Sequence, residues 1–335
     1  MSTADVRSRQ GLSRRVRTAV DPIAYPAAVF SLLLIVLGIA SGPAFSGAFN
    51  VSNILLQVTP LLMIAIGQTF AIATGGLDLS VGSTASLSAV VTATLMQPLG
   101  PPLACLVGLC AGLAVGLING LAVASGFEAF LTTLATLSIA QGAALFVRPT
   151  PGGEVPPEFG VIAGFWNNLP VALPIVLLAA AAAAFYLRRT RTGSDILSVG
   201  GDPGVSRLAG INVKRAYLTA YLICSGFAAL AGIYLVARTQ TGDPIIGGRF
   251  ALDSLAAVVV GGSLLAGGRV TLAGTVFGAL ALGLVSNVMN LWGVPTFYQN
   301  VAKGLILIAA ILLPTLIGAA TERSRRRASA RLAIG

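Results

Sequence analysis

Residues 54–74 read ILLQVTPLLMIAIGQTFAIAT, an apolar run without a charged side chain. About 20 such residues are enough for a helix to cross the hydrocarbon core of a bilayer. Residues 75–83, GGLDLSVGS, follow directly, and a second apolar run begins at Val81. Lipid offers no water to backbone polar groups, so a spanning segment of this length must be a helix. The stretch therefore predicts two membrane helices joined by a short polar connector.

The same pattern covers most of the chain. Of its 335 residues, 56% are hydrophobic and 10% are charged, which is too little charge to cover a water-soluble surface. Apolar windows predict an all-α polytopic membrane protein with about ten spans. The predicted spans are Ile23–Ser41, Ile54–Thr74, Val81–Met96, Pro102–Ser125, Ala129–Val147, Val171–Leu187, Ala216–Ala237, Leu252–Ala266, Val270–Met289 and Thr296–Ile317. The third and eighth are short, as broken helices that enter a membrane partway are.

Basic residues are concentrated in three segments, which fixes a predicted orientation. The segments carry Arg7, Arg9, Arg14, Arg15 and Arg17, then Arg188, Arg189, Arg191, Arg207, Lys214 and Arg215, and finally Arg323, Arg325, Arg326, Arg327 and Arg331. With ten spans they share one side with Arg269, whereas the other side holds only Arg148, Arg238 and Arg249. Cytoplasmic loops carry the excess of Lys and Arg, so both termini are predicted to be cytoplasmic. The net charge of +10 thus reflects membrane topology, and we predict no nucleic-acid partner.

The predicted domain organisation follows from these spans. It consists of a basic cytoplasmic tail over residues 1–21, a transmembrane domain over 22–318 and a second basic tail over 319–335. A long cytoplasmic loop over 188–215 interrupts the transmembrane domain.

Several kinds of chemistry lack their residues in this sequence. Histidine is absent, and the three cysteines lie inside apolar runs, so we predict no metal site. The only lysines, Lys214 and Lys303, stand outside any G-x-x-x-x-G-K-[ST] phosphate loop. We therefore predict a non-enzymatic chain that binds no cofactor itself, and any ATP that drives it must bind to another polypeptide.

The connector after residue 74 contains the first candidate site. Gly75 and Gly76 allow a sharp turn, and Asp78 is an ionisable group between two apolar spans. Such a residue is a candidate for a substrate or proton site. It also fits a helix cap that accepts backbone N–H bonds at the start of the third span, and both roles are compatible.

The loop over residues 188–215 contains a second candidate. Asp202 and Pro203 fit an N-cap and a first helical position, and Gly210 fits the end of a short helix over Val205–Ala209. A short exposed helix that is basic and partly apolar needs a partner or a membrane surface. A solvated positive-inside loop is the alternative, but the paired start and stop signals favour a docking element.

Polar residues within the spans complete the candidate path. Residues 242–253 and the Gly-rich run after them hold Asp253, and intramembrane amides include Asn119 and Asn287. Each amide fits an interhelical hydrogen bond or a hydrophilic path suited to a neutral polyol. The glycine spacing before Asn119 also resembles that before Asn287, which indicates an internal repeat. The candidate translocation residues are Gly75, Gly76, Asp78, Ser80, Asn119, Thr132, Asp253 and Asn287.

Several motifs in order resemble one family. They are GQTFAIATGGLDLSVGS over residues 67–83, AFLTTL over 129–134, SRLAGINV over 206–213 and LDSLAAVVVGGS over 252–263. The chain is similar in these motifs to the ribose-type permeases of bacterial ABC sugar importers, in the branched-chain amino acid and sugar permease superfamily. Glu128 departs from the neutral residue that relatives often carry there.

The resemblance implies a fold of about ten helices per subunit, akin to type II ABC importers, in the bacterial inner membrane. It implies a second permease copy or paralogue, two ATP-binding cassette subunits that use the ATP, and a periplasmic or lipid-anchored sugar-binding protein. The transported molecule would be a ribose-like pentose, a hexose or a related small polyol. The implied ATPase-coupling residues are Asp202, Pro203, Ser206, Arg207, Leu208, Gly210, Ile211 and Asn212.

Two other functions remain open from the residues alone. One is a proton-coupled secondary transporter that uses Asp78 and needs no ATPase. The other is a membrane scaffold, in which the intramembrane amides serve only packing.

Overall fold

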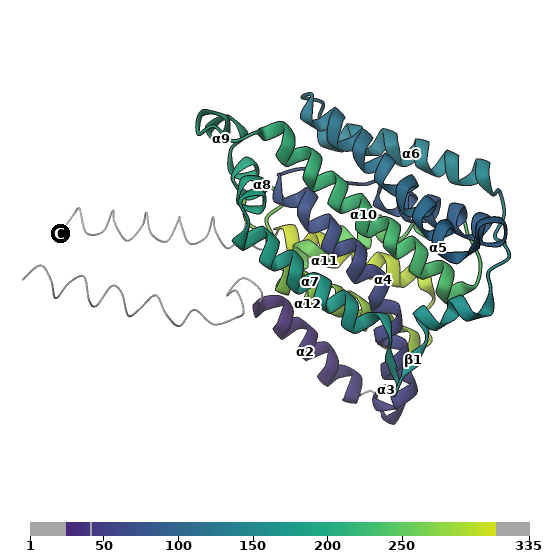
Figure 1. The fold of residues 1–335 in the computed structure, drawn as a ribbon. Coiled ribbons are helices and arrows are strands. Elements are labelled where there is room, and N and C mark those ends of the chain that lie inside the picture. Colours follow the sequence, from purple (N-terminus) through teal and green to yellow (C-terminus); the bar gives the residue numbers. More distant parts are fainter. Residues whose placement is uncertain (1–24, 41, 313–335) are drawn as a thin grey trace, which may run out of the picture.

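The structure is a computed structural model that describes residues 25–40 and 42–312. The predicted tails over 1–21 and 319–335, and the end of the last predicted span, lie outside the described residues. The described chain is a bundle of helices (Figure 1). Its first part comprises α2 (Tyr25–Ala40), α3 (Pro43–Ser46), α4 (Ala48–Ala73), α5 (Val81–Ala124) and α6 (Ala129–Val147).

A connector follows, with a 3₁₀ helix and a two-stranded hairpin, and the remaining helices come after it. The connector holds η2 (Pro157–Ala163), β1 (Phe165–Trp166) and β2 (Leu169–Pro170). The helices are α7 (Ala172–Arg189), α8 (Arg191–Gly201), α9 (Pro203–Leu208), α10 (Val213–Thr239), α11 (Phe250–Val260), α12 (Leu272–Leu291) and one over Thr296–Leu312, here called the last described helix.

Six of these helices are long and apolar enough to cross a membrane: α4, α5, α6, α7, α10 and α12. Shorter apolar helices lie at Ala27–Ala40, Phe250–Val260 and Thr296–Leu312. The predicted all-α polytopic architecture is confirmed. The count of ten spans and the side on which the termini lie stay predictions.

A break divides α5 where the sequence predicts two spans. Gly100 has φ 75° and ψ 161°, outside the helical region, and Pro101 and Pro102 follow it. A proline lacks the N–H that would continue a helix across this point. The two predicted spans therefore meet end to end here, with almost no loop between them.

The predicted span Leu252–Ala266 is wrong at its C-terminal end, because α11 stops at Val260. The residues after it form a tight glycine-rich connector, in which Gly262, Gly267 and Gly268 all have positive φ. Gly268 N–H donates to the Ala73 carbonyl oxygen at 3.1 Å, so this connector packs against the end of α4. Glycine is the residue that takes such backbone angles without strain.

The described chain contains two series of helices that run in opposite directions. One is α4, α5 and α6; the other is α10, α11, α12 and the last described helix. Thr74 after α4 and Val213 at the start of α10 line the same pocket, so α4 ends where α10 begins. We call this end of the bundle, which also carries α8 and α9, the α9 end (Figure 1). An internal repeat of inverted direction fits this arrangement.

The two series meet where the segment before α11 contacts the first turns of α5. Gly247, just before α11, donates its N–H to Ser86 Oγ of α5 at 2.9 Å. A Cβ added at Gly247 would clash with the carbonyl oxygen of Gly82. Both positions therefore require glycine for the backbones to approach this closely.

Candidate functional site

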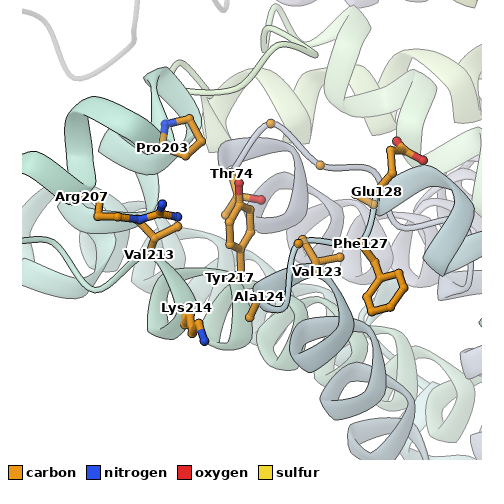
Figure 2. A pocket seen from close by; sticks show the side chains of 14 residues that line it. Thr74, Val123, Ala124, Phe127, Glu128, Pro203, Arg207, Val213, Lys214 and Tyr217 are labelled. Atoms are coloured by element: carbon orange, nitrogen blue, oxygen red, sulfur yellow. The ribbon is translucent and has the colours of Figure 1, made fainter.

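A pocket of about 390 Å³ lies at the α9 end. Four chain segments form it: the α4–α5 connector, the α5–α6 turn, α9 and the start of α10. Figure 2 shows Arg207 and Lys214 on one side of the pocket and Phe127 and Glu128 on the other. The pocket therefore joins the connector motif and the 188–215 loop, which the sequence singled out separately.

The short helix α9 is defined by its caps. The Asp202 carboxylate accepts hydrogen bonds from Gly204 N–H at 2.7 Å and Val205 N–H at 2.9 Å, and Pro203 is the first helical residue. Gly210 has φ 81° just beyond its end. The predicted start and stop signals are confirmed, although the helix begins at Pro203 and not at Val205.

One residue of α9 is buried, and the exposed ones include two apolar side chains. Ser206 is buried, whereas Val205 is 62% and Leu208 is 91% exposed. After the turn at Gly210, Ile211 N–H donates to the Ser206 carbonyl oxygen, and Asn212 caps α10 through Arg215 N–H. Local hydrogen bonds thus hold α9 firmly while its apolar side chains point away from the chain.

Asp78 lies in a fully buried polar cluster just beyond the pocket wall. Its Oδ1 accepts from Ser80 N–H at 2.9 Å and from Ser80 Oγ at 2.6 Å. Asn119 Nδ2 donates to Ser80 Oγ at 2.9 Å and lies 3.5 Å from both carboxylate oxygens. Thr136 Oγ1 donates to Asn119 Oδ1 at 2.6 Å. The cluster joins the connector, the second part of α5 and α6.

Asp78, the predicted cap, lies two residues before the N-cap of α5, which is Ser80. The carboxylate bonds to Ser80, which precedes the first residue of α5, and the N–H groups of the first turn of α5 lie beyond this contact. Burial raises the pKa of the Asp78 carboxyl, and hydrogen bonds, those from Ser80 foremost, oppose that shift.

The glycines of the connector are needed by the backbone and by close packing. Gly75 has φ 80°, and a Cβ there would lie 3.1 Å from the Ala266 carbonyl oxygen. A Cβ at Gly76 would clash with the hydroxyl of Tyr221, which lies 3.4 Å from the Leu77 carbonyl oxygen. The connector is therefore packed between the glycine-rich connector after α11 and helix α10.

On α6, the candidate translocation residue Thr132 lies outside this cluster, and two neighbouring threonines contact the cluster or its connector. Thr132 bonds to the Glu128 carbonyl oxygen of its own helix. Thr133 donates to the Leu77 carbonyl oxygen at 3.2 Å, and Thr136 reaches Asn119. The spacing of three residues between these two threonines is the helical signal that could have identified this face. Glu128 itself caps α6 through Phe130 N–H and Leu131 N–H.

The structure places Asp253 and Asn287 away from the Asp78 cluster. Asp253 pairs with Lys303 at 2.8 Å, from α11 to the last described helix. Asn287 exchanges two hydrogen bonds with Asn50, at 2.8 and 3.1 Å, and so joins the end of α12 to the start of α4. The candidate path residues therefore fall into three groups and not one.

Comparisons with known proteins find one transport permease family and several individual sugar permeases. The family described as "Branched-chain amino acid transport system / permease component" matches residues 50–311. The ribose import permease protein of Bacillus subtilis is 37% identical over 288 residues, covering 84% of this chain and 89% of the relative. The D-allose transport system permease protein of Escherichia coli is 32% identical, covering 86% and 90%. The galactose/methyl galactoside import permease protein of Haemophilus influenzae is 31% identical, covering 86% and 94%. A comparison with solved structures finds no match.

Proposed function

Because the chain belongs to the permease component family of branched-chain amino acid transport systems, as a ribose-type sugar permease of ABC importers, we propose that it conducts a monosaccharide across the membrane. It is a multi-pass protein of the bacterial inner membrane. The relatives carry ribose, allose and galactose in their names, which supports a pentose, a hexose or a related small polyol as the cargo.

The proposed assembly contains subunits that this chain lacks. A permease of an ABC importer works with an ATP-binding and a substrate-binding partner. We assign ATP hydrolysis to two cytoplasmic ATP-binding cassette subunits and sugar capture to a periplasmic or lipid-anchored protein. A second copy of this chain, or a paralogue, completes the membrane part. Sugar specificity then resides mainly in the binding protein.

In the proposed orientation the α9 end faces the cytoplasm. The excess of Lys and Arg in the 188–215 loop supports this placement. It puts the pocket of Figure 2 on the cytoplasmic side of the connector that holds Asp78. The two tails, over 1–21 and 319–335, then lie in the cytoplasm as well.

Exposure of Val205 and Leu208 on α9 is the observation that carries the proposal. An exposed apolar residue on a membrane-spanning helix can face lipid. Lipid does not explain the exposure here, because α9 is a short helix between α8 and α10 and is not one of the six candidate spans. Two exposed apolar side chains on a firmly capped helix fit a contact with another subunit. We propose that the ATP-binding subunit supplies it, and that its movement reaches the pocket through Pro203 and Arg207.

Replacing one exposed apolar side chain tests this contact. Leu208→Asp would place an unpaired charge in the interface, and an estimated cost of about 3 kcal/mol lowers ATPase recovery roughly a hundredfold. The measurement is co-purification of the ATP-binding subunit with the tagged chain in mild detergent. Val161→Asp, on a residue that is 69% exposed in η2, is the matched control and should recover the ATPase normally. Equal recovery with both variants would refute docking through α9.

A further inference from the structure

A second cavity lies away from the α9 end, among α4, α11, α12 and the last described helix. Its volume is about 120 Å³. It extends toward the turn after α12, because Asn290 and Thr296 on the two sides of that turn both line it. Its other hydrogen-bonding neutral side chains are Gln57, Ser286, Gln299 and Asn300. Four separate helices thus contribute side chains to one small space.

An ion pair forms part of the cavity wall. Lys303 Nζ lies 2.8 Å from Asp253 Oδ2, and the two side chains are 16% and 14% exposed. The same two residues, with Arg249 and Asn300, line an adjoining hollow of about 230 Å³. The pair is therefore accessible from two hollows, unlike the carboxylate of Asp78, which is completely buried.

The polar groups of the cavity are held in place by their neighbours. Gln299 is buried, and its Nε2 donates to Asn290 Oδ1 at 2.6 Å and to the Val294 carbonyl oxygen at 3.0 Å. The Arg249 guanidinium carbon lies 4.9 Å from the centre of the Phe250 ring. A pocket with a few fixed polar groups and some apolar wall is the usual form of a small-molecule site.

The mixture of groups indicates the chemical class of the ligand. A hard cation prefers a set of oxygen ligands without neighbouring cations, and an anion prefers donors without a carboxylate. Here a carboxylate, an ammonium, a guanidinium and several amides line one space, so it offers both donors and acceptors. A neutral molecule with many hydroxyl groups, each of which both donates and accepts, matches this lining best.

We propose that this cavity is a binding site for a neutral monosaccharide on its route through the permease. The inference rests on the proposed function, because only a sugar permease would bring such a ligand to a space between membrane helices. Sugar hydroxyls would bond to the Asp253 carboxylate, to the Lys303 ammonium and to the amides of Gln57 and Asn300. Binding must stay weak enough for release, as for any site on a transport path.

Protection of an introduced thiol tests the site directly. The complete importer is reconstituted with Cys105, Cys110 and Cys224 replaced by Ala and with Asn300→Cys, and it is treated with a membrane-impermeant maleimide. D-ribose, D-allose or D-galactose is added in turn. The transported sugar should slow alkylation roughly tenfold when present at about ten times its Kd. Glu158→Cys in η2, outside the cavity, should react at an unchanged rate.

A second measurement does not depend on labelling. Gln57→Leu keeps the side-chain size but removes the amide, and it should raise the KM for uptake about tenfold without loss of ATPase binding. Asn53→Leu, on the same helix but outside the cavity lining, should leave the KM unchanged. A KM unchanged in both variants would refute the site, whatever the labelling shows.

The outcomes separate the site from the proposed function. If the unsubstituted importer takes up a sugar but that sugar does not protect position 300, or its KM is unchanged by Gln57→Leu, the site is refuted and the sugar permease stands. If none of the three sugars is taken up and none protects, both proposals fail.

Discussion

Two carboxylates occupy comparable places in the two helix series, and their surroundings differ. Asp78 lies just before α5, and Asp253 lies in the first turn of α11, each at the start of a helix that follows a connector. Asp78 is fully buried, and Ser80 and Asn119 surround it with neutral donors. Asp253 is partly exposed, bonds to the charged Lys303 and borders a cavity.

The contrast indicates that carboxylates near the starts of α5 and α11 serve two purposes. A buried carboxylate must be hydrogen-bonded, and the Asp78 cluster uses its donors to join the connector to α5 and α6. Asp78 does not line the pocket at the α9 end or either of the two hollows near α11, whereas Asp253 and Lys303 line both of those hollows. We interpret the first as a structural junction and the second as a site for ligand.

The largest expected effect is on stability, with Asp78→Ala. The change leaves the Ser80 N–H and the Ser80 hydroxyl without their buried acceptor, at an estimated cost of about 3 kcal/mol. The thermal midpoint in detergent and the membrane yield should both fall strongly. A variant as stable as the unsubstituted chain would contradict the structural role.

A smaller loss is expected at the contact between the two series. Gly247→Ala would drive a methyl group into the Gly82 backbone, which cannot yield as a flexible side chain can, and should cost about 2 kcal/mol. Gly248→Ala is the control, because its Cβ would lie an ordinary 3.4 Å from the nearest atom. The thermal midpoint of both variants checks this, and equal midpoints would show that the two connectors are not tightly packed.

Removing the Lys303 ammonium, which pairs with Asp253, should affect transport more than stability. Lys303→Met leaves Asp253 unpaired, but water from the two hollows can reach it, so the expected cost is about 1 kcal/mol. The KM for sugar uptake should rise while the thermal midpoint falls less than with Asp78→Ala. If Lys303→Met proves as destabilising as Asp78→Ala, the two sites do not differ in the way proposed.

The smallest effect is expected for Asp78→Asn. The amide oxygen can still accept from Ser80, so the cluster should persist and uptake should stay within about twofold of the unsubstituted importer. Uptake is measured in vesicles with and without an uncoupler. Loss of uptake in this variant alone, together with sensitivity to the uncoupler, would favour the proton-coupled alternative.

Sequence patterns predict most helices more accurately than the places where the chain turns between them. The spans Ala129–Val147 and Val270–Met289 lie within two residues of α6 and α12, because apolar length and glycine spacing are local signals. The span Leu252–Ala266 was too long, since an apolar composition continues past Gly261 while the backbone turns. Local composition does not report that change of direction.

The candidate sites show the same limit. The caps at Asp202 and Gly210 were predictable because both partners are neighbours in sequence. The bond from Thr136 to Asn119 and the pair of Asp253 with Lys303 depend on helix packing, so residue type alone could not match the partners. Which threonine of α6 faces the connector is not readable from the sequence, because that side of α6 is fixed only by contact with the connector.

The energy source of uptake tests the central claim most directly. Cells or vesicles that carry the complete importer are given radiolabelled D-ribose, D-allose and D-galactose, with either ATP depleted or the proton gradient collapsed while ATP is maintained. For an ABC sugar permease, ATP depletion abolishes uptake of the transported sugar, and collapse of the proton gradient leaves it intact. Uptake that survives ATP depletion and stops with the proton gradient would contradict the account.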